Sequence, residues 1–198
     1  MIQAGILLTD KKIFLIRHGE TDWNRQKIWQ GQRGPGLNTN GRDQIENTAL
    51  KLKSAGITEI YSSDVKRAVE TAQIISGSLG LDFITNHAFR ERDMGDYTGL
   101  PESEVLKRNP GLEFQHGFLG SNDLPTVEKW DSFVNRIIDG LQDILSVLEG
   151  NKAVVTHGGV IYIALAYFDK TKVFPVVPNG NISVVRVKPD ICVEEVYL

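Results

Sequence analysis

The chain has 198 residues, of which 41% are hydrophobic and 24% are charged, and its formal net charge is −3. This length and composition predict one domain, 1–198, with a sizeable core. Scattered acids and bases argue against a basic surface for nucleic acid or for an anionic membrane, so we expect a small-molecule partner. The one cysteine, Cys192, excludes an internal disulfide and offers no metal-ligand spacing, and we expect it to be an ordinary strand residue.

The sequence has no segment that resembles a membrane span or a secretory leader. No apolar stretch approaches the roughly 20 residues that cross a bilayer. The N-terminus lacks the basic and long apolar regions of a signal peptide. We therefore expect a cytoplasmic protein with no membrane partner.

Short apolar runs alternate with helical patterns along the chain. Ile13 to Ile16 is a continuous apolar run, which is typical of a strand buried on both faces of a parallel sheet. The alternation predicts an α/β fold, a three-layer α/β/α sandwich around a mainly parallel sheet. After this strand the sequence predicts a helix capped by Asn38 and ending near Gly56, a strand in 58–64, and a helix capped by Asp64 and running to about Leu79. A strand over 81–85 and an irregular stretch over 89–100 follow. The last predicted elements are a helix over 126–148, a strand that ends at His157, a buried helix over 160–168, and strands in 181–187 and 192–198.

Three predicted strands are followed by residues whose side chains bind phosphate or react with it. Arg17 and His18 follow the first strand, 62–67 follows the second, and His157 follows a later one. Parallel sheets bind ligands at the carboxyl ends of their strands, so we expect these residues to meet in one crevice. Arg67 stands in the first turn of its helix, where the dipole disfavours a cation unless an anion binds there.

A phosphate ester carries nearly two negative charges and three acceptor oxygens, so its site needs several charge-assisted donors around one point. Arginine suits this task because its planar group can hold two oxygens at once. The sequence offers such donors at Arg17, Asn24, the backbone near Gly31, Arg67, His157 and the backbone near Gly158.

Within this group His18 is the predicted nucleophile, which would form a phosphohistidine. It must be neutral to attack, and the neighbouring cations disfavour its charged form, while a hydrogen bond from its second ring nitrogen to the backbone would fix the tautomer. The leaving alkoxide needs a proton from a carboxyl group. Glu91 is the predicted donor, with Glu20 and Asp93 as alternatives.

Six motifs in order along the chain carry a resemblance to a known family. The segments "LIRHGETDWN" with "WQG", "YSSDVKRAVETAQ", "RERDMGDYTG", "VVTHGG" and "NGNISVV" resemble the histidine phosphatase superfamily, in the branch that includes phosphoglycerate mutases and related phosphatases. The similarity extends from about Ile13 to Val187. It implies a phosphoglycerate mutase-like fold.

The resemblance also implies a role for each matching residue. His18 would accept the phosphoryl group, Arg17, Arg67 and His157 would form the phosphate pocket, and Glu91 would donate the proton. The positions that contact phosphate or lie beside it are Asn24, Gln30, Gly31 and Gly158. No metal or organic cofactor is implied for the phosphatase members, and the sequence shows no compact acidic cluster for Mg²⁺ or Zn²⁺.

Two enzymatic reactions share this chemistry, and they differ in whether water or a second hydroxyl receives the phosphoryl group. Mutases of the family are usually longer and have an asparagine after the "HG" pair, where this chain has Gly159. "MGDYTG" looks like the phosphatase pattern, although Tyr97 and Thr98 stand where those members often have Trp-Glu. We therefore predict a metal-independent phosphatase that hydrolyses a small phosphorylated metabolite. A phosphoglycerate mutase that needs 2,3-bisphosphoglycerate is the alternative, and a non-catalytic phosphate-binding module is the second.

Aromatic residues near the motifs are candidates for the walls of the pocket. Trp23 and Trp29 lie close to the first motif. The segment 101–125 contains Phe114, His116 and Phe118, which are candidates for a lid over the substrate, although the sequence does not decide whether this segment forms a lid or covers the core. The sequence predicts neither the metabolite nor the oligomeric state.

Overall fold

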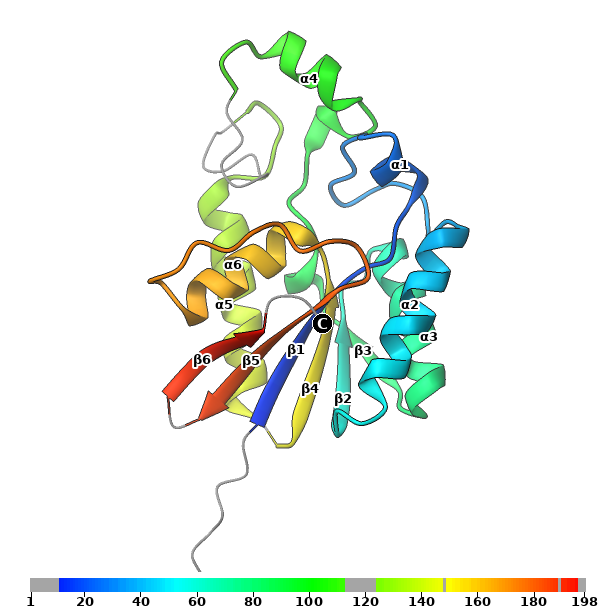
Figure 1. Ribbon diagram of the computed structural model, residues 1–198. Coiled ribbons are helices and arrows are strands. Elements are labelled where there is room, and N and C mark those ends of the chain that lie inside the picture. Colours follow the sequence, from blue (N-terminus) through cyan, green and yellow to red (C-terminus); the bar gives the residue numbers. More distant parts are fainter. Residues whose placement is uncertain (1–10, 113–123, 148, 189, 196–198) are drawn as a thin grey trace, which may run out of the picture.

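The structure is a computed structural model, and it describes residues 11–112, 124–147, 149–188 and 190–195. Its strands are β1 (Lys11–Arg17), β2 (Ile57–Ser62), β3 (Phe83–Thr85), β4 (Asn151–Thr156), β5 (Ile182–Lys188) and β6 (Asp190–Glu195). They form one six-stranded sheet in the order β3-β2-β4-β1-β5-β6 (Figure 1). The pairs β3-β2, β2-β4 and β4-β1 are parallel, whereas the pairs β1-β5 and β5-β6 are antiparallel.

Helices cover both faces of this sheet. α2 (Thr39–Leu52) and α3 (Lys66–Leu79) pack on one face, and α5 (Trp130–Ser146) and α6 (Gly158–Phe168) pack on the other. The shorter α1 (Asp22–Arg25) and α4 (Glu102–Arg108) lie beyond the carboxyl end of β1 (Figure 1). This is the three-layer α/β/α sandwich with a mainly parallel sheet that the sequence predicts.

The first strand divides its side chains between two cores. Ile13 and Leu15 pack in the cluster that contains α5 and α6, while Phe14 and Ile16 pack in the cluster that contains α2 and α3. Successive side chains of a strand point to opposite faces, so a strand covered on both sides must be apolar at every position. The continuous apolar run therefore predicted this central strand correctly.

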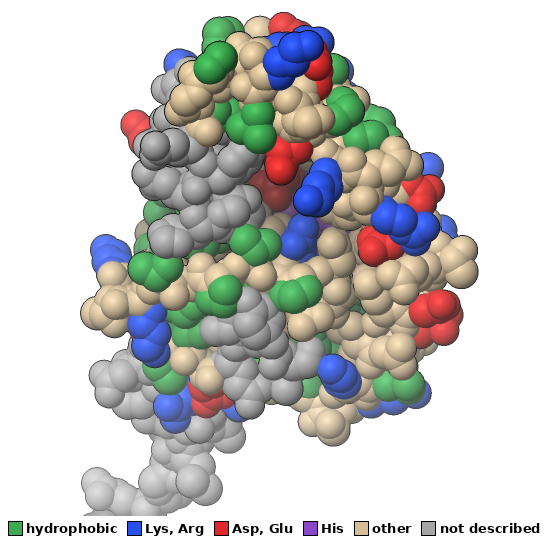
Figure 2. Space-filling model, turned by 45° about the horizontal axis from the view of Figure 1, so that its top comes forward, with side chains coloured by type: hydrophobic (Ala, Val, Ile, Leu, Met, Phe, Trp, Pro, Cys, Tyr) green, Lys and Arg blue, Asp and Glu red, His purple; other side chains and the backbone are tan. Residues whose placement is uncertain are grey.

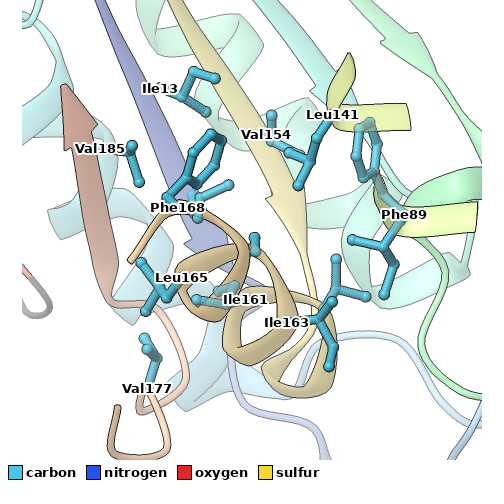
Figure 3. Close-up of a cluster of buried hydrophobic side chains, with 14 of the residues drawn as sticks. Ile13, Phe89, Leu141, Val154, Ile161, Ile163, Leu165, Phe168, Val177 and Val185 are labelled. Carbon is cyan, nitrogen blue, oxygen red and sulfur yellow. The ribbon is translucent and has the colours of Figure 1, made fainter. Parts of the chain in front are cut away.

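The helix predicted over 160–168 is buried along most of its length, because its sequence is apolar on every side. Figure 3 shows Ile161 and Phe168 of α6 packed among side chains that include Ile13 of β1 and Val185 of β5. Burying one such side chain stabilises the fold by about 1.5 to 3 kcal/mol. α6 thus fixes the position of its own first turn relative to the carboxyl ends of β1 and β4.

The predicted meeting of the strand ends is confirmed. β1 and β4 are paired so that Arg17 lies opposite Thr156, and the N–H of His18 donates to the Thr156 carbonyl at 2.9 Å. His18 and His157 therefore leave neighbouring strands at the same edge. β2 lies on the other side of β4, and the helix after it, α3, carries Arg67 in its first turn.

The segment between α6 and β5 returns across this same edge. The N–H of Gly180 lies 3.1 Å from the carbonyl of Arg17 and 3.2 Å from that of His18, and the Arg17 N–H donates to the Asn181 carbonyl at 3.0 Å. β5 starts directly afterwards and runs back along β1. Residues near the C-terminal end thus hold the backbone of the first motif.

Three predicted helix boundaries are wrong. Asp64 does not cap α3, because its carboxylate binds the Arg90 guanidinium, with Nε to Oδ1 at 2.6 Å. Such a charge-assisted pair is stronger than an ordinary cap. α2 keeps its predicted cap at Asn38 but ends at Leu52, before Gly56. α5 begins later than predicted because Thr126 has φ +64°, which a helix does not accommodate.

Two short helices, α1 and α4, have no counterpart among the predicted elements. α4 lies in the segment expected to form a lid, but Phe114, His116 and Phe118 lie outside the described residues. Cys192 lies in β6, as predicted. Within the described ranges, each helix is too short or too polar to cross a membrane.

Candidate active site

A cavity of about 210 Å³ lies at the carboxyl edge of the sheet. Figure 2 shows this hollow, with acidic, basic and histidine side chains gathered inside it. Most of the predicted site residues line it, namely Arg17, His18, Asn24, Gln30, Gly31, Arg67 and Glu91. The two predicted residues that do not line it are His157 and Gly158.

The His18 ring is held by a hydrogen bond at each of its nitrogens. Nδ1 lies 2.7 Å from the Gly19 carbonyl, and Nε2 lies 3.0 Å from Nε of Arg67. A carbonyl only accepts and a guanidinium only donates, so these partners place the ring proton on Nδ1 and leave the lone pair on Nε2. The backbone contact that the sequence analysis expected for the second ring nitrogen is present.

The surroundings of His18 favour its neutral form. The side chain is only 3% exposed, and burial is the largest cause that lowers its pKa well below the ordinary 6.5. The charges of Arg67 and Arg17 lower this pKa further. The sequence predicts that the cations lower the pKa of His18, but the larger lowering by burial follows only from the fold.

Arg67 is 2% exposed and donates from all three of its nitrogens. Besides His18, its partners are the carbonyls of Arg33 at 2.9 Å and Gly31 at 2.8 Å. A guanidinium has five N–H groups, so three are used in these bonds and two remain for phosphate oxygens. Burial lowers the pKa of Arg67 to about 10, so it stays charged at neutral pH.

Arg17 is bound less completely than Arg67. Its NH1 donates to the Val177 carbonyl at 2.6 Å, and its buried Nε has no partner among the described residues. Burial lowers the pKa of Arg17, and the nearby carboxylate of Glu91 partly opposes this shift. The orphaned Nε of Arg17 is a donor that an anion in the cavity can satisfy.

His157 lies behind the cavity wall and is fully buried. Its ring centre is 5.2 Å from that of His18, and its Nε2 lies 2.8 Å from Oγ of Ser63. Its Nδ1 is buried with no partner in the described part of the chain. Burial, with the charge of Arg67 as the second cause, lowers the pKa of His157 well below 6.5. Sequence reasoning missed Ser63, although it lies in the segment that follows the second strand.

Helix α1 and the loop between α1 and α2 supply amide and backbone groups. Oδ1 of Asn24 and Oε1 of Gln30 both lie 3.0 Å from Oγ of Thr21, which fixes the two side-chain amides. Gly31 has φ +51°, and a Cβ atom there would lie 2.8 Å from the Met94 nitrogen. Glycine is therefore required where the loop brings its carbonyl to Arg67.

Of the three carboxylates that the sequence offers as proton donors, Glu91 alone lines the cavity. Its Oε2 accepts from the Gly159 N–H at 3.1 Å, and its Oε1 accepts from the N–H of Arg92 at 2.9 Å. Glu20 binds Asn38 and Arg25 instead, and Asp93 accepts from the backbone of Gly95. The geometry therefore favours Glu91 over both alternatives.

Gly159 lines the cavity where the sequence analysis expected Gly158 to contribute. Its N–H is already bound to Glu91, so it does not serve as a phosphate donor. A Cβ atom at position 159 would lie 2.4 Å from Oε1 of Glu91. Any side chain there would require the carboxylate to move.

Sequence reasoning missed much of the outer wall of the cavity. Of the two tryptophans expected to wall the pocket, Trp29 lines the cavity and Trp23 does not. Trp130 lines it as well, together with Arg92, Glu102 and Tyr162. These residues come from α4, α5, α6 and an irregular stretch, and no local pattern links them. Asn179 was also missed, and its Nδ2 donates to the His18 carbonyl at 3.0 Å. Asn179 begins the motif "NGNISVV", which marked this segment as part of the family pattern but did not indicate the contact with His18.

The described residues contain no group of three or more His, Cys, Asp or Glu side chains arranged to hold a metal ion. The arrangement around His18 combines a neutral imidazole whose Nε2 lone pair accepts from Arg67, a second guanidinium group at Arg17 and the carboxyl group of Glu91. Such a set can accept a phosphoryl group and stabilise the charge on its oxygens.

Comparison with known proteins identifies relatives of both enzymatic kinds. The chain is 34% identical to the uncharacterized phosphatase PhoE of Bacillus subtilis, covering 77% of this chain and 75% of the relative. It is also 34% identical to a 2,3-bisphosphoglycerate-dependent phosphoglycerate mutase of Thermoplasma acidophilum, over 80% of this chain and 76% of that one. The phosphoglycerate mutase-like protein 4 of Arabidopsis thaliana is 41% identical, and the match covers 76% of this chain and 67% of that protein.

Solved structures have the same fold. Bacillus stearothermophilus YhfR superposes with a TM-score of 0.82 at 25% identity, covering 94% of this chain and 96% of that one. The family model of the histidine phosphatase superfamily (branch 1) matches residues 13–196. The chain therefore belongs to the histidine phosphatase superfamily, branch 1.

Proposed function

We propose that the protein is a metal-independent phosphatase that hydrolyses a small phosphate ester through a phosphohistidine at His18. The observation that carries this proposal is the pair of hydrogen bonds on the His18 ring, which leaves the lone pair on Nε2 beside the Arg67 guanidinium. Burial and two cations keep this ring neutral, as a nucleophile must be.

The reaction has two steps in this proposal. Nε2 of His18 attacks phosphorus, the P–O bond to the alcohol breaks, and the carboxyl group of Glu91 gives a proton to the leaving oxygen. Water then attacks the phosphorus, the P–N bond breaks, and Glu91 takes the proton from that water. Arg17 and Arg67 bind the phosphate oxygens through both steps, and His157, which lies behind the cavity wall, packs beside the His18 ring with the ring centres 5.2 Å apart.

The test of the nucleophile is covalent labelling. Wild-type protein incubated with a radiolabelled phosphate ester in EDTA should acquire acid-labile label, because a phosphohistidine has formed. His18→Ala should acquire none and should retain its fold by circular dichroism. The matched control is His87→Ala, since His87 is an exposed histidine outside the cavity and its variant should label like the wild type. Label on His18→Ala would refute the assignment.

The role of Glu91 is tested through the leaving group. Glu91→Gln should lower kcat/KM by about a hundredfold or more for alkyl phosphates and much less for p-nitrophenyl phosphate, whose leaving group needs no proton. The measurement is the ratio of the two rates in both proteins. Equal losses for the two substrates would remove Glu91 from this role.

The alternative reaction is phosphoglycerate mutase activity, which the name of the Thermoplasma acidophilum relative favours. Gly159 supports the phosphatase, because mutases of the family usually have an asparagine there and a side chain at this position would displace Glu91. Incubation of the protein with 3-phosphoglycerate, with and without 2,3-bisphosphoglycerate, separates the two. Free phosphate supports the phosphatase, and accumulation of the 2-isomer supports the mutase.

A further inference from the structure

The cavity has two chemically different parts. Its base holds His18, Arg17 and Arg67, which carry the two positive charges that match a phosphate dianion. The remaining described wall is largely apolar or aromatic and is formed by Ile28, Trp29, Met94, Trp130, Phe133 and Tyr162. An ester bound by its phosphate at the base would place the carbon skeleton of its alcohol against this wall.

Two charged side chains, Arg92 and Glu102, line the cavity outside the base. Arg92 is 2% exposed, donates from Nε to the Glu128 carbonyl at 2.7 Å, and lies over the Trp130 ring at 5.4 Å, so the protein itself holds its guanidinium. The two side chains carry one charge of each sign. This outer part therefore supplies no net positive charge for a second anionic group of the substrate.

Glu102 stands across the cavity from the sheet. It is the first residue of α4, which lies beyond the carboxyl end of β1 (Figure 1). Its backbone is fixed by the hydrogen bond from its N–H to the Lys27 carbonyl at 2.9 Å. Within the described ranges its carboxylate has no hydrogen-bond or ion-pair partner, and it lines the cavity. A carboxylate in this setting accepts hydrogen bonds and repels anions.

We infer that Glu102 determines specificity by selecting alcohols that present a hydrogen-bond donor, a hydroxyl or an ammonium group, and by rejecting alcohols that carry a carboxylate. This inference rests on the proposed phosphatase function. It deepens that function, because it names the substrate class as phosphomonoesters whose alcohol part is uncharged or cationic and disfavours phosphoglycerates.

The test uses two substrates that differ in one group. Glycerol 3-phosphate and 3-phosphoglycerate share a skeleton, but one ends in a hydroxymethyl group and the other in a carboxylate. Wild-type kcat/KM should favour glycerol 3-phosphate, and Glu102→Gln should reduce this preference about tenfold, since it removes the repulsion. Glu104→Gln is the matched control, because Glu104 lies on the same helix, pairs with Arg108 and does not line the cavity. Its preference should equal that of the wild type.

A second pair distinguishes the two kinds of donor. Ethanolamine phosphate carries an ammonium group and propyl phosphate carries none. If Glu102→Gln lowers kcat/KM only for glycerol 3-phosphate, the donor is a hydroxyl group. If it lowers kcat/KM only for ethanolamine phosphate, the donor is an ammonium group. Either result supports the inference.

A wild-type preference for 3-phosphoglycerate, or an unchanged preference in Glu102→Gln, would overturn the inference while hydrolysis of p-nitrophenyl phosphate still supports the proposed function. Absence of that hydrolysis in the wild type overturns both.

Discussion

The Arg67 guanidinium is fixed by three acceptors of the protein itself, and one of them is the nitrogen assigned as the nucleophile. Its bonds to the carbonyls of Gly31 and Arg33 hold its plane in place, so Nε meets Nε2 of His18 at 3.0 Å. One side chain thus links the loop before α2, the first turn of α3 and the end of β1. Arg67 orients the imidazole in addition to binding phosphate in the proposed mechanism.

A lysine at this position cannot reproduce that geometry, because its ammonium group is a point charge without a planar fork. Arg67→Lys should lower kcat/KM by about a hundredfold, as loss of a charge-stabilising donor does in other active sites. It should also weaken inhibition by inorganic phosphate. Steady-state kinetics with phosphate as inhibitor measure both effects. Arg42→Lys, which alters an exposed arginine paired with Glu70, should change neither. Wild-type kinetics for Arg67→Lys would show that charge alone suffices.

At the scale of elements, helix α5 positions the segment that carries Glu91. Arg136 of α5 donates to the carbonyls of Ala88, Arg90 and Glu91 at 2.7 to 2.9 Å. The same guanidinium forms a bidentate ion pair with Glu128, in which Nε donates to Oε1 at 2.7 Å and NH2 donates to Oε2 at 2.9 Å. Because the segment itself is irregular, this arginine supplies the rigidity that a strand or helix would otherwise give.

Removing that anchor should affect both stability and proton donation. Arg136→Met leaves three carbonyls and the Glu128 carboxylate without their partner, and we expect a loss of about 3 kcal/mol in the free energy of unfolding. Because Glu91 loses its fixed position, activity on alkyl phosphates should fall more than activity on p-nitrophenyl phosphate.

Urea unfolding and the ratio of the two rates measure these effects. Arg108→Met, at an exposed pair on α4, should change stability by less than about 0.5 kcal/mol. An unchanged rate ratio in Arg136→Met would leave Arg136 a purely structural role.

The elements that the sequence predicts correctly are those whose burial has a local signature. β1 is apolar from Ile13 to Ile16, α6 is apolar along most of its length, and Asn38 caps α2 as its side chain suggests. The errors arise where a distant residue competes. Asp64 binds Arg90 from another segment, and a sequence window around Asp64 contains no sign of it. α4 was missed because its seven residues bury only Val105.

Considered as a whole, the molecule buries two neutral histidines against two cations. His18 and His157 have pKa values well below 6.5, so the folded protein resists protonation that the unfolded chain accepts. The unfolded state then binds more protons, and the free energy of unfolding rises with pH in this range. Stability is present above about pH 6.5 and is lost as the pH falls below it.

Because of this linkage, we expect the free energy of unfolding to fall by up to about 1 kcal/mol per pH unit for each histidine as the pH falls from about 6.5 to 5. Urea unfolding at several pH values measures it. His157→Gln should lower the slope, whatever its effect on stability at neutral pH, because one buried titrating group is gone. His87→Gln serves as the comparison, since His87 is exposed. A wild-type stability that is flat or increases on acidification in this window would contradict the burial of neutral rings.

The base of the site follows from sequence far better than its outer wall. Arg17, His18 and His157 come directly after strands, and parallel topology brings such ends together whatever the details of packing. Glu102 and Trp130 reach the cavity only because α4 and α5 are placed by contacts between distant segments. The residues proposed to bind phosphate are therefore readable from local patterns, whereas those proposed to contact the alcohol depend on tertiary structure.

The return segment before β5 has a consequence for biosynthesis. Val177 holds the Arg17 guanidinium, and Asn179 and Gly180 hold the backbone of His18, from positions about 160 residues downstream. A nascent chain that has left the ribosome only as far as α6 already carries every proposed catalytic side chain. It still lacks the return segment, whose hydrogen bonds orient Arg17 and His18. In the proposed mechanism, Arg17 and His18 are oriented only after the return segment has also been made.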